Sequence, residues 1–327
     1  MKKKFAGLLM FIGLCAAVSA QNTAEADFNV ALTADGTGVV IEKYTGKGGV
    51  ITIPATIEGM PVREIGEGAF AYKEEYAYNY SINTNITAVT FPAGLVKIGA
   101  DAFAYCAGLS SVVIPDSVTE IGEGAFRGCY QRPDTRARPP KPATGLTSVT
   151  LPKGLAKAGG GGNEAPDNSG GIFYECLLLK TVTIPEGVQV IGDNMFAGCE
   201  ALTTIVIPNS VTSLGRYAFR GSGLVSFTLG NGITLIPLGA FKDCTNLQTV
   251  VIPEGIVKID GGRGFSYIES GGSFSGCTAL TSVTLPSTIK MLGACRAFQS
   301  GYVPFRVTGK FVAELPGEKA YNPFFPG

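Results

Sequence analysis

Six cysteines recur at one position of this sequence, three residues after a phenylalanine in every case. They are Cys106, Cys129, Cys176, Cys199, Cys244 and Cys277. Thiols at a regular spacing could bind a metal ion, pair as disulfides or fill a hydrophobic core. A zinc site needs close CxxC pairs or histidines, and the 327-residue chain contains neither. We therefore predict no metal site and interpret the cysteines as small core residues that form an inward ladder.

Disulfide bonds within this ladder remain an alternative. If the cysteines lie on adjacent strands, their spacing of ~4.8 Å falls within the Cα range that a disulfide permits. Side chains that leave parallel strands in register give a poor disulfide dihedral, however. One of the eight cysteines, Cys15, lies in a predicted export signal, so the remaining odd number leaves at least one thiol unpaired.

Catalytic chemistry finds no support in the residue types. The chain contains no histidine, which excludes nucleophiles activated by a Ser-His or Cys-His pair. Serine, threonine and valine dominate the outward positions of the strands predicted below, and no carboxylate is among them, so that face lacks the acid pair of a glycosidase. We interpret these hydroxyls as a solvated strand face, although the rows are also similar to those of ice-binding solenoids. We predict no catalytic residue and no enzyme.

A glycine-rich segment at 158–171 could suggest a phosphate-binding loop. It contains AGGGGNEAPDNSGG, without the Gly-Lys-Ser/Thr ending or the following helix that such loops need. Glu164, Asp167 and Asn168 could ligate calcium, but their spacing matches no strong calcium motif. We interpret the segment as a flexible loop and predict no cofactor.

The cysteines belong to a repeat of about 23 residues, which also sets the positions of nine phenylalanines. Their separations are 22 to 24 residues, or 33 or 47 where extra residues intervene, and they are Phe70, Phe103, Phe126, Phe173, Phe196, Phe219, Phe241, Phe274 and Phe298. The unit is L-x-x-V-x-I-P-x-x-V-x-x-I-G-x-x-A-F-x-x-C-x-x, complete in LSSVVIPDSVTEIGEGAFRGC. Such a unit buries its apolar side only against its neighbours, so nine copies predict a solenoid.

Within one unit the pattern predicts a short strand followed by a corner. Val182 and Ile184 point inward and Thr183 points outward, which is the period of two that marks a strand. Pro185 ends the strand because proline cannot donate to the ladder, and Phe196 fills the middle of the coil. Strands from successive turns would lie ~4.8 Å apart and form one continuous parallel sheet.

The repeat resembles the BspA-like leucine-rich repeats of bacterial surface proteins, also called the Treponema pallidum type. The matching run is L-x-x-I-x-[IL]-P-x-x-[LV]-x-x-I-G-x-x-A-F-x-x-C over about residues 48–300, and FNVALTADGTGVVIEKYTGKGGVITIP resembles that family's N-terminal leader. The resemblance implies a mostly β, right-handed leucine-rich-repeat solenoid of about nine 23-residue turns, with a parallel β-sheet on the concave face and an N-terminal hairpin cap. It also implies adhesion to host proteins or to other bacterial cells. Less regular turns are expected where residues depart from the repeat, at Ala158, Gly230, Pro237 and Asp260.

The sequence divides into four predicted parts. They are an export signal, a capping hairpin, the solenoid and a C-terminal cap or tail, at residues 1–20, 21–47, 48–300 and 301–327. The hairpin is predicted from alternating apolar and polar residues around A-D-G-T-G. A cap is expected because an open solenoid exposes its core and a strand edge. Insertions interrupt the repeat at 71–85, 130–145, 158–171 and 260–272.

Two of these insertions, 71–85 and 130–145, leave the repeat between the Phe corner and the next strand. They should emerge on the same rim about 10 Å apart and could share a binding surface. Tyrosine and arginine dominate binding hot spots, and these insertions supply both. The candidate rim residues are Tyr72, Tyr76, Tyr78, Tyr80, Tyr130, Arg132, Arg136 and Arg138. Weaker candidates on a different edge are Phe265 and Tyr267. The alternative is that these loops merely tolerate extra residues.

The first residues predict export. Three lysines precede an apolar run from Phe5 to Val18, and a V-S-A site ends at Ala20. The run is too short to span a bilayer, and no later run approaches that length. Lipidation of Cys15 is an alternative, although Leu14 precedes it where a lipoprotein signal needs a small residue.

Charge narrows the partner class. Without the signal, the chain carries 23 basic and 26 acidic residues, which argues against a nucleic-acid partner. We predict an exported binding module, a bacterial surface adhesin that recognises a host matrix or serum protein or another bacterial surface protein through the solenoid and its inserted loops. The alternatives are a periplasmic or envelope scaffold that binds components of its own cell and, less favoured, a glycan-binding protein.

Overall fold

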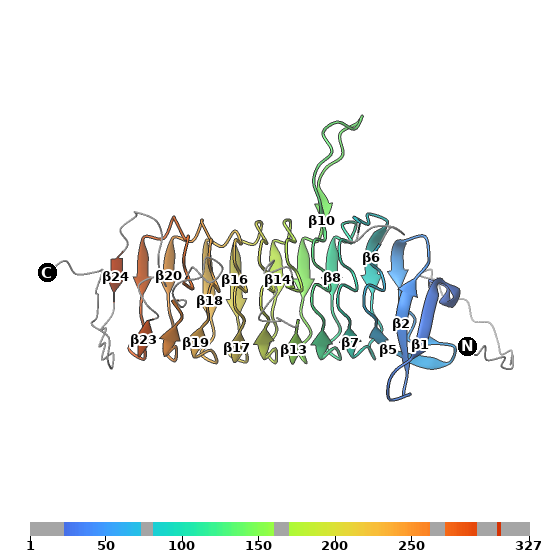
Figure 1. Ribbon diagram of the computed structural model, residues 1–327, viewed down its shortest axis with the longest axis horizontal. Helices are drawn as coiled ribbons and strands as arrows, with labels where there is room; N and C mark the ends of the chain where they lie inside the picture. The colour runs from blue at the N-terminus through green and yellow to red at the C-terminus, as the bar shows by residue number, and fades with distance from the viewer. Residues whose placement is uncertain (1–22, 73–80, 160–169, 262–271, 293–305, 309–327) are drawn as a thin grey trace.

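The computed structural model describes residues 23–72, 81–159, 170–261, 272–292 and 306–308. These residues form an elongated solenoid, along which the chain advances turn by turn from the N-terminal strands to the C-terminal ones (Figure 1). The elements are short β-strands, apart from one 3-10 turn among the described residues, η1 (Glu25–Asp27). This architecture is the mostly β leucine-rich-repeat solenoid that the repeat predicts.

One row of parallel strands, the main row, comes from the L-x-x-V-x-I-P part of each repeat. Side chains alternate as expected: in β16, Ile205 and Ile207 are buried, whereas Thr204 and Val206 are exposed. Adjacent strands pair in register, so that equivalent residues of successive turns stand side by side. The main row consists of β3 (Gly49–Thr52), β6 (Ile86–Thr90), β8 (Ser111–Val113), β12 (Ser148–Thr150), β14 (Thr181–Thr183), β16 (Thr204–Ile207), β18 (Ser226–Leu229), β20 (Thr249–Val251), β22 (Ser282–Thr284) and β24 (Arg306–Thr308).

A second row of parallel strands lies at the V-x-x-I-G part of the repeat, and the sequence did not predict it. Most of its strands have only two residues, of which the second points inward: Ile98 and Ile121 are buried beside the outward Lys97 and Glu120. Two residues are too few to show a period of two, so the pattern revealed only an inward isoleucine. The second row consists of β2 (Val39–Tyr44), β5 (Met60–Ile65), β7 (Lys97–Ile98), β9 (Glu120–Ile121), β13 (Lys157–Ala158), β15 (Val190–Ile191), β17 (Ser213–Leu214), β19 (Leu235–Ile236), β21 (Lys258–Ile259) and β23 (Met291–Leu292).

A column of phenylalanine rings fills the space between the two rows. Successive rings from Phe70 to Phe274 stack with centroids 4.5 to 5.5 Å apart and with interplanar angles of 3° to 14°. Seven of these rings, those from Phe103 to Phe274, are 0% exposed. Phe298, the ninth phenylalanine of the sequence pattern, lies outside the described residues. The column gives each turn the same interior, which explains why the phenylalanine repeats so strictly.

An antiparallel hairpin caps the N-terminal end, as predicted. β1 (Phe28–Leu32) pairs with β2, and the hairpin continues the second row because β2 pairs in parallel with β5. At its turn, Asp35 accepts hydrogen bonds from Thr37 N at 3.0 Å and Thr33 Oγ1 at 2.7 Å. The rings of Phe28 and Tyr44 cover the end of the phenylalanine column. Next to the cap, β4 (Thr56–Ile57) pairs with β5 in a second antiparallel turn.

Carboxylates tie consecutive turns together at several of the corners that follow main-row strands. Asp116 Oδ1 accepts Lys153 N at 3.1 Å, and Glu254 accepts both Ser287 N and Ser287 Oγ at 3.0 Å. Hydrogen bonds from these backbone amides, helped by the neighbouring side chains, lower the pKa of Asp116 and of Glu254 below the ordinary values. The charged carboxylates therefore stabilise the spacing of successive turns.

The turns that depart from the repeat stay in register. Ala158 is buried in β13, which pairs with β9, and Asp260 N donates to Ile236 O at 2.9 Å. Gly230 N donates to Ile207 O at 2.7 Å, in the corner where other turns carry proline. The backbone ladder therefore tolerates these substitutions because it needs the main-chain geometry and not the side chain.

Candidate functional site

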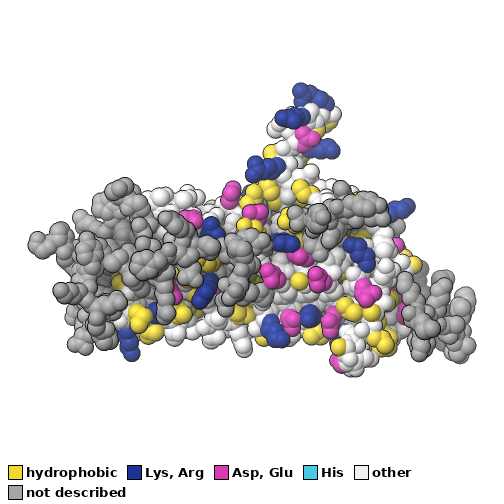
Figure 2. Space-filling view, viewed as in Figure 1, with side chains coloured by type: hydrophobic (Ala, Val, Ile, Leu, Met, Phe, Trp, Pro, Cys, Tyr) yellow, Lys and Arg dark blue, Asp and Glu magenta, His cyan; other side chains and the backbone are white. Residues whose placement is uncertain are grey.

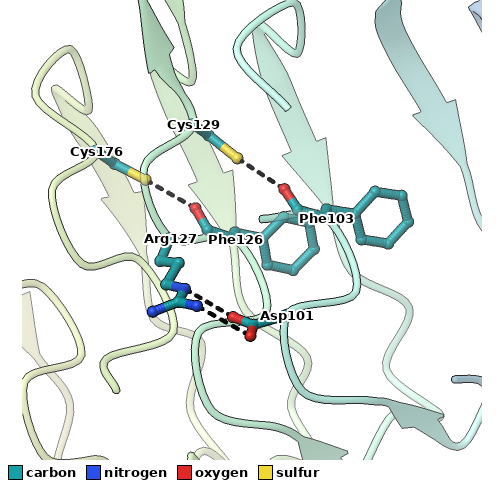
Figure 3. Close-up of polar contacts among 6 residues, drawn as sticks. All are labelled: Asp101, Phe103, Phe126, Arg127, Cys129 and Cys176. Atoms are coloured by element: carbon teal, nitrogen blue, oxygen red, sulfur yellow. Dashed lines mark hydrogen bonds and ion pairs between the residues drawn. The ribbon is translucent and has the colours of Figure 1, made fainter. Parts of the chain in front are cut away.

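The six repeat cysteines lie inside the solenoid and face carbonyl groups of the preceding turn. All six are free thiols with 0% exposure. Each Sγ donates to the carbonyl oxygen of the column phenylalanine one turn earlier, over Sγ–O distances of 3.1 to 3.5 Å. Figure 3 shows two of these bonds, from Cys129 to Phe103 and from Cys176 to Phe126. The thiols give additional hydrogen bonds to buried backbone acceptors, which is a structural role.

Burial also keeps these thiols unreactive. It raises the pKa of Cys106 and of Cys244 to about 12, and it raises the pKa of Cys129, Cys199 and Cys277 as well. The thiolate is the nucleophilic and metal-binding form of cysteine, and at neutral pH it is not populated at these positions. Among the described residues, no group of three or more His, Cys, Asp or Glu is placed to hold a metal ion. Burial and the hydrogen bonds to phenylalanine carbonyls thus account for the repeated cysteines as core residues.

The outward face of the main row carries mainly small hydroxyl and valine side chains. Val113, Thr150 and Thr183 stand side by side on three neighbouring strands, and Val113 is 69% exposed. The described strands of the main row contain no aspartate or glutamate. Small hydroxyl and valine side chains in uniform rows give this face little relief.

The insertion at 130–145 forms a ribbon that projects from the solenoid, which we call the arm (Figure 1). Its base is the antiparallel pair β10 (Tyr130–Gln131) and β11 (Thr144–Gly145). Asp134 and Lys141 form a further bridge, with N–O distances of 2.9 Å in both directions. Beyond that bridge, Asp134 Oδ1 accepts the amides of Arg136 at 2.9 Å and Ala137 at 3.1 Å, which organises the tip. The arm is therefore a structured element and not a loose loop.

The arm concentrates positive charge. It carries four basic residues and one acidic residue, Asp134, and the four are Arg132, Arg136, Arg138 and Lys141. All four basic side chains are exposed. Figure 2 shows them as a blue cluster that stands clear of the mixed charges on the visible face of the solenoid. A partner approaching the arm would meet cations first.

A hollow of about 650 Å³ lies at the foot of the arm, and we call it the foot hollow. Residues of both insertions border it, together with residues of the neighbouring turns. The lining residues are Ile82, Tyr105, Gly128, Tyr130, Gln131, Arg132, Glu175 and Leu177. Ile82 belongs to the first insertion and is 51% exposed. Two segments that lie about 50 residues apart in the sequence therefore meet at one surface.

One wall of the foot hollow is held in place by an ion pair. Arg127 Nε lies 2.7 Å from Asp101 Oδ1, and Arg127 also packs over the Tyr105 ring, 5.7 Å from its centroid. Figure 3 shows the two-pronged Arg127–Asp101 contact. Burial raises the pKa of Asp101, and the Arg127 guanidinium opposes that rise. The pair orients the tyrosine that lines the hollow.

Gly128 is required for the shape of this wall. It has a φ of +61°, and an added Cβ would come within 2.5 Å of the Tyr105 ring. Any other residue would displace the ring or strain the backbone. The glycine thus creates the space between Tyr105 and the arm.

The candidate rim residues that the structure describes do not all line the foot hollow. Tyr130 and Arg132 line the foot hollow, whereas Arg136 and Arg138 lie beyond the Asp134–Lys141 bridge at the tip. Tyr72 is 51% exposed, and its backbone pairs with Ser81 at the base of the first insertion. The other candidates lie outside the described residues: Tyr76, Tyr78, Tyr80, Phe265, Tyr267, Cys15 and the three possible calcium ligands Glu164, Asp167 and Asn168.

Tyr105, Glu175 and Leu177 of the foot hollow were not predicted from the sequence, whereas Tyr130 was. Tyr105 and Glu175 each stand two residues after a column phenylalanine, and Leu177 and Tyr130 each stand one residue after a ladder cysteine. Equivalent repeat positions lie side by side in a solenoid, so these four positions could have been grouped on that basis. Ile82 gave no such signal because it lies within an insertion.

A second hollow, of about 470 Å³, lies along the second row. Outward residues of successive strands alternate in charge there: Glu120 lies 3.0 Å from Lys97 Nζ and 3.3 Å from Lys157 Nζ. Contacts with Lys97, and then with Lys157, lower the pKa of Glu120. These charges pair across the strands as a cross-strand ladder. The lining of the hollow as a whole holds four glutamates and two lysines.

Comparison with known protein families tests the resemblance between this repeat and the BspA-like repeats. The family model described as "BspA type Leucine rich repeat region" matches in six copies, at residues 74–134, 169–267 and 262–301. Together these matches cover more than half of the chain. The chain belongs to this family. BspA-type proteins are non-enzymatic leucine-rich-repeat chains, typically at the cell surface or secreted, and their repeats act as protein-interaction modules.

Several solved structures are similar to this BspA-type chain. The Treponema pallidum leucine-rich-repeat protein shares 24% identity over 86% of this chain and 92% of its own, with a TM-score of 0.44. A leucine-rich cell surface protein from Faecalibacterium prausnitzii A2-165 shares 22% identity over 90% and 97%, with a TM-score of 0.33. A leucine-rich-repeat protein from Bacteroides ovatus ATCC 8483 shares 16% identity over 86% and 98%, with a TM-score of 0.40.

No curated protein matches the BspA-type sequence described here. Among the residues that the structure describes, no helix has the length and apolar character needed to cross a bilayer.

Proposed function

We propose that this chain is an exported, non-catalytic adhesin that binds a host protein or another bacterial surface protein through the arm and the foot hollow. The observation that carries the proposal is the meeting of two insertions beside one hollow. Ile82 comes from the first insertion and Tyr130 and Arg132 from the second, while the main row between the two ends of the solenoid stays uniform. Interruptions of a repeat that gather in space are the feature expected of a recognition surface.

The composition of this surface suits a protein partner. Tyr105, Tyr130, Leu177 and Ile82 give the hollow apolar lining, and Arg132 and Glu175 add one charge of each sign. Protein interfaces combine apolar, aromatic and arginine side chains in this way. Tyrosine brings large contact area at a low entropic cost, and arginine brings a forked donor for carboxylates. The arm would extend the contact beyond the hollow and orient the partner through its charge.

Partner capture with a matched bait tests the proposal. The first bait is residues 21–327, and the second replaces residues 132–143 by the dipeptide Asn-Gly, which closes the ribbon after Gln131 with a two-residue hairpin turn. Both are exposed to host matrix proteins, serum and the surface proteins of neighbouring bacteria. Proteins that bind the first bait and not the second support the proposal. If every captured protein binds both baits equally, the arm is not the recognition surface.

Display at the cell surface is tested separately, on intact cells that produce the protein. A membrane-impermeant amine label should reach Lys141, which is exposed on the arm. Labelling only after the cells are opened would place the protein inside the envelope and favour the scaffold alternative.

A further inference from the structure

The arm is the most protruding part of the described chain, and it carries the bonds that a common class of protease attacks. Serine proteases of trypsin type hold a lysine or arginine side chain in a pocket with a carboxylate and cut the peptide bond that follows. Exposed loop tips are the preferred sites of such cuts. All four basic residues of the arm, Arg132, Arg136, Arg138 and Lys141, are exposed.

Three of these four residues are followed directly by proline. The pairs are Arg132-Pro133, Arg138-Pro139 and Lys141-Pro142. The chain has 26 lysines and arginines, and none outside the arm is followed by proline. All three pairs therefore lie on the exposed arm.

Proline after the cut position blocks this chemistry. In hydrolysis, the carbonyl carbon of the basic residue takes the hydroxyl of a water molecule, the C–N bond breaks, and the leaving nitrogen takes a proton from the catalytic histidine. A proline nitrogen carries a ring carbon in place of hydrogen, and its ring fixes the backbone and restricts the preceding residue. The leaving group then cannot enter the site in the geometry that proton transfer needs.

The fourth basic residue of the arm, Arg136, is the only one of the four that is not followed by proline. Arg136 is followed by Ala137, and both lie in the tip between Asp134 and Lys141. Their amides donate to Asp134 Oδ1 at 2.9 and 3.1 Å, and Arg138 Nη1 donates to Thr135 O at 3.4 Å and to Ala137 O at 3.3 Å. All four of these hydrogen bonds are exposed to solvent. Opening a tip of this kind costs little free energy.

We propose that the arm is protected by its prolines against proteases that cut after lysine and arginine, and that Arg136–Ala137 is its single cleavable bond. Cleavage there leaves an Arg136 carboxylate and an Ala137 ammonium group. The Asp134–Lys141 bridge and the β10–β11 base still join the two legs, so the nicked solenoid stays assembled. The tip is thus a processing site whose cut alters the arm and leaves the fold intact.

Limited digestion of native residues 21–327 with trypsin tests this directly. New α-amino groups are labelled during digestion and identified by mass spectrometry, with attention to positions 131–145. The expected result is one new terminus in this range, at Ala137, and the Arg136→Gln variant should yield none. A terminus at Pro133, Pro139 or Pro142, or an uncut Arg136–Ala137 bond when other exposed bonds of the chain are cut, would overturn the proposal.

Proline variants separate protection by chemistry from protection by stiffness. Pro139→Ala and Pro142→Ala should each create one new cut, after Arg138 or after Lys141. Pro140→Ala is the matched control, since it loosens the same leg but follows no basic residue. It should add no new terminus. If Pro140→Ala opens bonds as readily as Pro139→Ala, or if neither Pro139→Ala nor Pro142→Ala adds a cut, the prolines do not act as proposed.

Discussion

The phenylalanine column and the arm follow opposite rules. The column repeats one side chain in every described turn, with ring centroids 4.5 to 5.5 Å apart and almost no exposure. The arm occurs once, exposes its charged side chains and contacts the solenoid only through its base. Packing thus dictates the residues of the column, whereas the exposed charged residues of the arm lie outside the packing of the solenoid.

This difference shows where to look for function in a repeat protein. A residue that recurs in each turn is constrained by contacts with the turns on either side. The thiols of the cysteine ladder, for example, donate to phenylalanine carbonyls of the preceding turn. A residue that breaks the repeat is free of that constraint. The foot hollow is built by insertions and by variable repeat positions, so the strict repeat and the candidate site hardly overlap.

The strongest test of the column removes one ring. Phe196 is 0% exposed and stacks at 5.5 Å on both Phe173 and Phe219. Phe196→Ala should lower the free energy of unfolding by about 3–5 kcal/mol, because it leaves a cavity between two turns that cannot collapse. Urea unfolding measures this, with Phe196→Leu as the control that keeps most of the volume and should lose less. Equal stability of Phe196→Ala and the unchanged protein would mean that the column does not hold the solenoid together.

The cysteine ladder should show a smaller effect. Cys199 is buried and donates to Phe173 O at 3.3 Å. Cys199→Ala removes the donor and leaves a small cavity, so it should cost about 1–2 kcal/mol. Cys199→Ser keeps a donor and should retain more of the stability. An alanine variant as stable as the unchanged protein would show that neither the bulk of the thiol nor its hydrogen bond stabilises the fold.

Acid should weaken the carboxylate hydrogen bonds between turns and leave the packing of the phenylalanine column unchanged. The pKa values of Asp116 and Glu254 are lowered in the folded protein, so the unfolded chain binds protons first as the pH falls. Their stabilisation is complete above the ordinary carboxyl pKa and is lost as the pH falls through the lowered values. Urea unfolding at a series of pH values should show a decline below about pH 4. Glu254→Gln should decline less steeply, and an equal decline would show that this link is not pH-sensitive.

Removing the arm should have the smallest effect on stability. The replacement of residues 132–143 by Asn-Gly keeps the β10–β11 pairs and the whole column. The free energy of unfolding should change by less than about 0.5 kcal/mol, as for other surface changes. A loss comparable with that of Phe196→Ala would mean that the arm supports the solenoid and would remove the contrast between the two regions.

The parts of the fold that were predicted are those with a recognisable pattern in the local sequence. The column and the main row follow from the period of the repeat and from the alternation within it. The N-terminal hairpin follows from the alternation around A-D-G-T-G, before the repeat begins. The second row was not predicted because most of its strands have two residues, too few to show a pattern.

The arm and its hollow were only partly predictable. The segment YQRPDTRARPPKPATG has four prolines and no alternation, so it suggests a loop; its ribbon depends on pairing at the base between Tyr130 and Gly145. Tyr105 and Glu175 join the hollow from turns about 70 residues apart in sequence, which only the stacking of turns brings together.

The most direct test of the central claim compares affinities for the first captured partner. Three proteins are needed: residues 21–327, the arm-shortened variant, and a variant with Thr183→Lys and Thr228→Lys on the exposed main row. Loss of the arm should weaken binding by at least about tenfold, since each tyrosine or arginine anchor contributes about 1–3 kcal/mol. The main-row variant should bind as tightly as the unchanged chain. Normal binding by the arm-shortened variant together with loss of binding by the main-row variant would contradict the account and place the site on the sheet.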